Sequence, residues 1–149
     1  MRLRRRQAIL GKLVKLQSIL RSPLYRSALL RHNVAAGVEH ERVLGALDCR
    51  SVVDVGANCG KFSLVARRCF TEATIVAFEP LSGPAERFRQ VWAGDPLVSL
   101  HQYALGALRA DSTMHISGSD DSSSLLPITS RQSSIFPGTG ESATTLVHI

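Results

Sequence analysis

The 149-residue sequence predicts an α/β fold built on a parallel sheet with flanking helices. Short runs rich in β-branched residues alternate with helical patterns in the order β-α-β-α-β, and short connections join them. Such alternation is typical of parallel sheets with right-handed crossovers. The length suits one domain with a sizeable core.

Positive charge gathers at the N-terminus. Residues 1–38 hold nine Lys/Arg and no Asp/Glu, whereas residues 39–149 hold nine Lys/Arg and twelve Asp/Glu. The net charge of +6 therefore comes from the first segment. The rest of the chain gives no support for nucleic-acid binding.

Residues 1–37 are predicted as a basic, amphipathic helical segment that precedes a domain at 38–149. Apolar residues recur at helical spacing between positions 9 and 20, and Ser22-Pro23 is expected to end one helix and start another. Lysines interrupt any signal-peptide core, and no apolar run is long enough to span a membrane. One interpretation is a transit peptide or peripheral contact with an anionic membrane. We favour the other, a helix packed beside the domain.

The strand that organises the chain is predicted at Ser51–Val55, where three valines in five residues suit a short, buried strand. A helical segment at Val34–Leu47 leads into it. The turn Gly56–Gly60 follows, and its glycines allow close approach of a ligand to the backbone. A helix at Lys61–Phe70 comes next, so N–H groups at its start would face that ligand.

A second strand is predicted at Ala73–Phe78, followed at once by Glu79 and Pro80. Proline cannot continue a central strand, so Glu79 stands where the strand ends. It lies 19 residues after Gly60, the spacing at which nucleotide-binding units place an acid on the ribose hydroxyls. The alternative is a surface acid before a turn.

The third strand is predicted at Leu97–Tyr103, after a helix at Pro84–Trp92. His101 falls within this strand, and a lone histidine is more often structural than catalytic. The pattern then changes: residues from about 112 to 149 are rich in Ser and Gly. Strands at 112–117 and 144–149, with loops between them, predict a hairpin-like insertion.

Metal and thiol chemistry receive little support. Asp120 and Asp121 are adjacent, but no further acids stand at ligand spacing, so we expect a solvated loop and no metal site. Cys49, Cys59 and Cys69 are odd in number and form no CxxC pair. They predict reduced thiols and a cytoplasmic protein.

Four segments together resemble the FkbM family of class I S-adenosylmethionine-dependent methyltransferases, with a Rossmann-like fold. They are VVDVGANCGKFS at 52–63, AFEP at 77–80, ALG at 104–106 and SSSLL at 122–126. The resemblance covers roughly residues 38–149. The DxGANxG form, with Asn58 in place of a middle glycine, is fairly specific to this family and argues against a dehydrogenase.

The resemblance implies S-adenosylmethionine as cofactor and O-methylation of a small-molecule or sugar hydroxyl. Asp54 would lie near the methionine portion and Glu79 would bind the ribose hydroxyls. The cofactor-binding residues implied are Asp54, Gly56, Ala57, Asn58, Gly60 and Glu79. No residue is assigned as general base, and the acceptor is not identified.

The resemblance also implies strands that this sequence does not contain. In the family a fourth parallel strand with a KIDVEG-like segment follows the insertion, and the glycine-loop strand is central. We therefore expect a truncated member with an incomplete sheet and with the strand at 51–55 on an open edge. Self-association through that edge is one expectation. The alternative function is an inactive remnant that binds cofactor weakly or needs a partner to complete the sheet.

Overall fold

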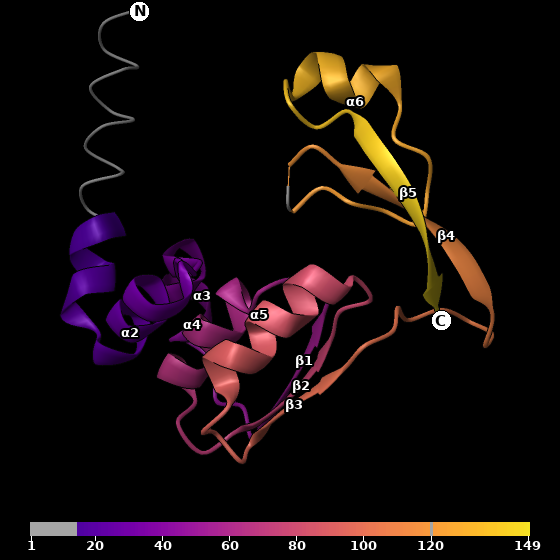
Figure 1. Cartoon of the computed structure of the whole chain (residues 1–149). Helices are drawn as coiled ribbons and strands as arrows, with labels where there is room; N and C mark the ends of the chain where they lie inside the picture. Colours follow the sequence, from indigo (N-terminus) through magenta and orange to yellow (C-terminus); the bar gives the residue numbers. More distant parts are fainter. Residues whose placement is uncertain (1–14, 120) are drawn as a thin grey trace, which may run out of the picture.

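The computed structural model describes residues 15–119 and 121–149. They form two units (Figure 1). The parallel unit, residues 15–101, contains a helical segment at 15–21, α2 (Pro23–His32), η1 (Val38–His40), α3 (Glu41–Leu44), β1 (Ser51–Val55), α4 (Lys61–Cys69), β2 (Thr74–Phe78), α5 (Ser82–Trp92) and β3 (Val98–His101). The hairpin unit, residues 111–149, contains β4 (Asp111–Ser117), α6 (Ser130–Ile135) and β5 (Glu141–His148).

The parallel unit has the predicted α/β arrangement of a parallel sheet with flanking helices. Its strands run in the order β1-β2-β3, and both pairs are parallel. Val53 pairs with Val76, which pairs with Ser99 on the other side. Helices α4 and α5 lie against one face of this sheet (Figure 1). The β-α-β-α-β order is therefore correct, with β3 shorter than expected.

The two faces of the sheet differ. Ile75 and Ala77 of β2 are fully buried beneath the helices. On the opposite face Val53 and Val55 are 61% and 59% exposed. The prediction of a buried strand at 51–55 is therefore wrong, because the face that carries Val53 and Val55 is exposed and only Asp54 of this strand is buried. An open edge at β1 was expected, and the described residues show it.

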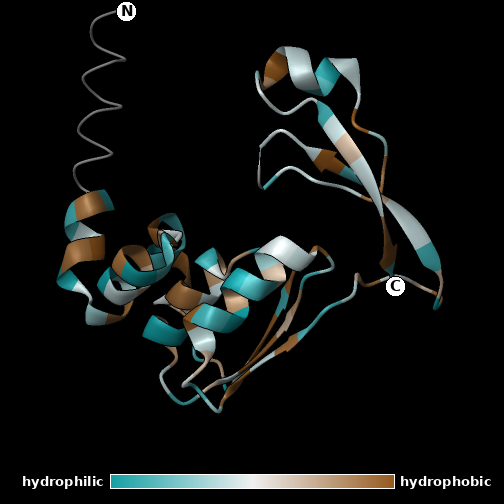
Figure 2. Cartoon of the chain, viewed as in Figure 1, coloured by the Kyte–Doolittle hydropathy of each residue, from teal (hydrophilic) through white to brown (hydrophobic). Residues whose placement is uncertain are grey.

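The core of the parallel unit joins the N-terminal helices to α4 and α5. Tyr25 and Val34 pack in the same apolar cluster as Leu64, Phe88 and Trp92. Figure 2 shows apolar residues gathered along the strands and on the inner sides of these helices. The amphipathic helix was expected from position 9 onward, but residues 1–14 lie outside the described part. The division of the chain at residue 37 stays a prediction.

The segment between α2 and β1 is less helical than expected. Ser22 caps α2 by accepting a hydrogen bond from the backbone N–H of Tyr25, as the predicted break at Ser22-Pro23 requires. Asn33 then ends α2 in a left-handed conformation, with φ of 55°. The helical segment predicted at Val34–Leu47 is correct only in part, because η1 and α3 are helical whereas residues 33–37 are irregular.

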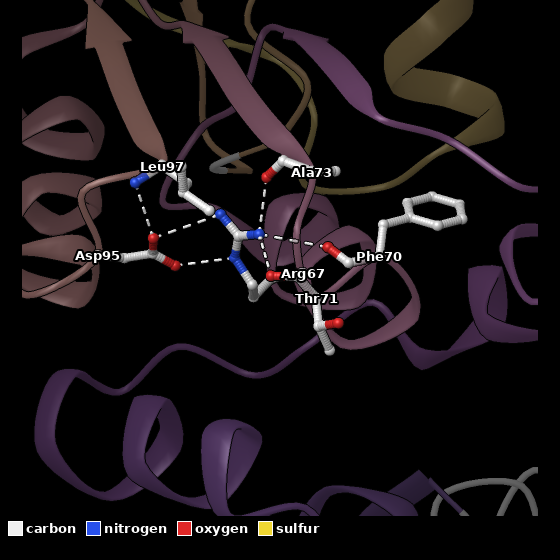
Figure 3. A network of polar contacts seen from close by, with 6 residues as sticks. All are labelled: Arg67, Phe70, Thr71, Ala73, Asp95 and Leu97. Carbon is white, nitrogen blue, oxygen red and sulfur yellow. Dashed lines mark hydrogen bonds and ion pairs between the residues drawn. The ribbon is translucent and has the colours of Figure 1, made fainter.

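The buried side chain of Arg67 links the C-terminal end of α4 to the segments that precede β2 and β3 (Figure 3). The Arg67 guanidinium donates hydrogen bonds to the carbonyl oxygens of Phe70, Thr71 and Ala73 at 3.2, 2.9 and 2.7 Å. Its Nε lies 2.8 Å from Asp95 Oδ2, before β3. Without the guanidinium these three carbonyl oxygens would each lose a hydrogen-bond donor. The Arg67 side chain therefore stabilises the turn between α4 and β2.

The hairpin unit has the predicted pair of strands, with differences in detail. β4 and β5 pair antiparallel, with a register shift between Ile116 and Ser117. Both strands are longer than expected. Residues 130–142 were expected to be a Ser/Gly/Thr-rich loop, but α6 forms there, because the Thr129 side chain accepts a hydrogen bond from the N–H of Gln132 at the first turn.

Candidate functional site

The glycine-rich turn after β1 is tied to the end of β2. The backbone N–H groups of Gly56 and Ala57 both donate to the carbonyl oxygen of Phe78, at 2.9 Å. Gly56, Asn58 and Gly60 have positive φ angles of 75°, 50° and 88°. This turn therefore lies at the carboxyl edge of the parallel sheet, where α/β folds place their ligands.

The two glycines of the turn serve different purposes. A Cβ added to Gly60 would come within 2.8 Å of Trp92 Nε1 and 3.1 Å of Phe88, so Gly60 lets α5 pack closely against the turn. A Cβ added to Gly56 would meet no atom within 4 Å. Gly56 therefore faces open space, as a backbone position approached by a ligand would.

Glu79 connects the turn to the end of β2. Its side chain is buried, and Oε2 accepts a hydrogen bond from the N–H of Asn58 while Oε1 accepts one from the N–H of Leu81, both at 2.8 Å. Burial raises the pKa of Glu79, the two N–H groups counteract this, and the Asp54 carboxyl adds to the rise. A surface acid before a turn would not be buried, so that alternative for Glu79 is wrong.

Asp54 is the buried residue of β1. Its Oδ2 accepts a hydrogen bond of 2.6 Å from the hydroxyl of Ser63, in α4. Burial raises the pKa of Asp54, and the hydrogen bonds from Ser63 oppose the rise. Ser63 was not among the residues predicted from the sequence. The available signal was its place in the first turn of the helix that follows the strand.

The turn and Glu79 line a pocket of about 130 Å³. Of the six residues predicted to bind cofactor, Gly56, Asn58 and Glu79 line it, whereas Asp54, Ala57 and Gly60 do not. The opposite wall comes from the hairpin unit: Met114, Asp121 and Ser123. That wall was not predicted, because Asp121 was expected in a solvated loop.

Other candidates from the sequence lie elsewhere. His101, at the end of β3, stacks on Phe78 with a centroid distance of 5.1 Å and does not line this pocket. No disulfide joins the three cysteines, all of which are described. Within residues 15–119 and 121–149, no group of three or more His, Cys, Asp or Glu side chains is placed to hold a metal ion.

Similarity to known proteins does not assign this chain to a family. No model of a known protein family matches the chain, and no curated protein matches it. In the part of the chain that the structure describes, no helix has both the length and the apolar character needed to cross a membrane. The geometry of the site therefore carries the functional conclusion.

Proposed function

We propose that this chain binds S-adenosylmethionine at the carboxyl edge of β1 and β2 and transfers its methyl group to a hydroxyl of a small molecule. One observation carries the proposal: the buried Glu79 carboxylate bonds the backbone of the glycine-rich turn at Asn58. An acid at the end of the second strand thus lies beside the turn that follows the first. The resemblance to FkbM methyltransferases, which rests on these same motifs, supports it.

The chemistry of the pocket suits the cofactor. Each Glu79 oxygen accepts one backbone hydrogen bond and keeps acceptor capacity for ribose hydroxyls. The open space at Gly56 lets a ligand lie against the backbone. A second pocket of about 330 Å³ shares Pro80, Leu81 and Ser123 with the first. A ligand larger than the first pocket, such as an adenosine with an amino-acid tail, would therefore have further space beside Pro80 and Leu81.

The residues of this chain would act mainly by positioning. The cofactor supplies an activated methyl group on a sulfonium cation, and displacement at that carbon requires the acceptor oxygen to lie in line with the bond that breaks. Glu79 would fix the ribose, the turn would hold the amino-acid portion, and the carboxyl of Asp54 would favour positive charge nearby. The proposed location is the cytoplasm, because the three cysteines are odd in number and form no CxxC pair.

The test is calorimetric titration of the purified chain with S-adenosylhomocysteine. We expect saturable binding that weakens about tenfold or more in Glu79→Gln, because an amide accepts fewer hydrogen bonds than a carboxylate. Glu72→Gln is the matched control, since Glu72 is exposed at the other end of β2 and should leave binding unchanged. Absence of binding by the folded chain would refute the proposal.

A second candidate is a protein that binds the cofactor only when a partner completes its sheet. The open β1 edge, with Val53 and Val55 exposed, favours it. Binding of S-adenosylhomocysteine would then increase with protein concentration in step with a change of oligomeric state measured by light scattering. Val53→Lys would abolish both effects. Binding that is independent of protein concentration would exclude self-association as the requirement.

A further inference from the structure

Loop residues 121–123 form a wall shared by two pockets. One is the 130 Å³ pocket beside the glycine-rich turn, and the other, of about 710 Å³, lies between this loop and α6. Asp121 and Ser123 line both pockets. The loop and α6 belong to the same hairpin unit (Figure 1). A ligand in the α6 pocket and a ligand at the turn would therefore both lie beside the Asp121 side chain.

The α6 pocket has the character of a site for a neutral, hydroxylated small molecule. Five of its ten lining residues carry hydroxyl groups, a guanidinium and a carboxylate add opposite charges, and two exposed apolar side chains at its rim help to make most of its surface apolar. Its residues beyond the shared pair are Ser119, Ser122, Thr129, Arg131, Gln132, Ile135, Phe136 and Thr139. Polar groups of this kind orient a ligand, and the apolar rim covers its less polar side.

The Asp121 carboxylate lies near the start of α4. Its Oδ2 lies 3.8 Å from the Nζ of Lys61, the first residue of that helix, and its Oδ1 accepts a 3.0 Å hydrogen bond from Ser119 Oγ. The side chain is still 64% exposed, so a ligand can reach it. An accessible carboxylate that lines both pockets is a candidate general base for a hydroxyl bound in either of them.

We propose that Asp121 stands at the reacting centre and that the α6 pocket holds the methyl acceptor. This inference rests on the proposed function. The acceptor hydroxyl oxygen forms a bond to the methyl carbon as the carbon–sulfur bond breaks, and the bonding electron pair goes to sulfur, which becomes a neutral thioether. The hydroxyl proton passes to the Asp121 carboxylate. The charges of the sulfonium and the carboxylate are both neutralised in this step.

A carboxylate beside the transferred methyl group must discriminate between a cation and a neutral ligand. We expect Asp121→Asn to weaken binding of S-adenosylmethionine by about three- to tenfold while S-adenosylhomocysteine binding changes by less than about twofold. Calorimetry without any acceptor measures both. Asp111→Asn is the matched control, because Asp111 is an exposed carboxylate on β4 that lines neither pocket.

The α6 pocket is tested with an extended probe: a nitrogen analogue of S-adenosylmethionine that carries a 4-hydroxybutyl group in place of the methyl. Gln132→Trp, which narrows the pocket, should weaken binding of this probe at least about fivefold and leave S-adenosylhomocysteine binding unchanged. Ser134→Trp should leave the binding of both the probe and S-adenosylhomocysteine unchanged, since Ser134 is an exposed residue of α6 outside the pocket.

The outcomes separate the two proposals. If the wild-type chain binds neither S-adenosylmethionine nor S-adenosylhomocysteine, the proposed function fails and this inference fails with it. If it binds both, and Asp121→Asn alters their affinities equally or not at all, Asp121 does not stand at the reacting centre. If Gln132→Trp leaves the extended probe unaffected, the acceptor does not occupy the α6 pocket.

Discussion

The parallel unit and the hairpin unit are built in different ways. Every large, fully buried side chain of the described residues lies in the parallel unit, Leu64 and Phe88 among them. In the hairpin unit Met114 and Val147 are the buried apolar residues, while Leu146 is 74% exposed. A core therefore stabilises the first, and backbone pairing between β4 and β5 holds the second. The candidate site lies where the stable unit meets the less buried one.

The largest expected effect comes from comparing the loss of one leucine side chain in each unit. Leu64→Ala should lower the free energy of unfolding by about 2–5 kcal/mol, because it leaves a cavity under α4. Leu146→Ala should change it by less than about 0.5 kcal/mol. Urea denaturation followed by the fluorescence of Trp92, the single tryptophan, measures both. Equal losses for the two variants would show that the units do not differ in this way.

The next effect compares ion pairs. Arg67→Met should cost about 3 kcal/mol of unfolding free energy, since it leaves three carbonyl oxygens and Asp95 without their buried partner. Asp111→Asn, which weakens the exposed contact with His148 across the hairpin, should cost less than about 0.5 kcal/mol. The same denaturation experiment applies. A loss below 1 kcal/mol for Arg67→Met, on the order of a surface pair, would contradict the role given to this network.

Within the parallel unit, alanine substitutions at three glycines distinguish a glycine needed for packing from one that faces open space. Gly60→Ala should destabilise by about 2 kcal/mol or more, from its left-handed φ and its contact with Trp92. Gly56→Ala introduces backbone strain but no steric contact, and should lower the free energy of unfolding by about 1 kcal/mol. Gly83→Ala, in α5 with open space around it, should be neutral or slightly stabilising. Thermal unfolding ranks the three. A greater loss at Gly56 than at Gly60 would be inconsistent with this packing.

The smallest expected effect is a change with pH. The folded-state pKa of Asp54 is raised, so its contribution to stability is present below the unfolded pKa and is lost as the pH rises through the folded value. Asp54→Asn removes this titration. The stability of the variant relative to wild type should therefore increase from pH 4 toward pH 7, as urea midpoints would show. A difference independent of pH would mean that the Asp54 pKa is not raised.

The sequence predicted the parts of the fold that local patterns control. β1, α4 and β2 begin and end within about a residue of their expected bounds, because valine-rich runs and helical spacing are local signals. The exposure of Val53 and Val55 was missed, since burial of a strand depends on which neighbours the sheet supplies. α6 was missed because its short, polar sequence, SRQSSI, carries no apolar periodicity.

The candidate site was predicted in part for the same reason. Gly56, Asn58 and Glu79 come together at one pocket because a parallel β-α-β unit brings the ends of adjacent strands to one edge. Asp121 reaches the pocket through a tertiary contact that no spacing rule encodes. Asp121 in particular is some 60 residues from Lys61, its ion-pair partner. Only the folded chain shows that the hairpin unit closes the site.

The most direct test of the account is amide chemical-shift mapping of S-adenosylhomocysteine on the isotopically labelled chain. The largest shifts are expected at the backbone N–H groups of Gly56, Asn58 and Leu81, with smaller ones at Asp121 and Ser123 on the opposite wall. This pattern would place the cofactor between the two units. Saturating ligand with no shifts at these amides, or with shifts confined to another part of the chain, would contradict the proposed site.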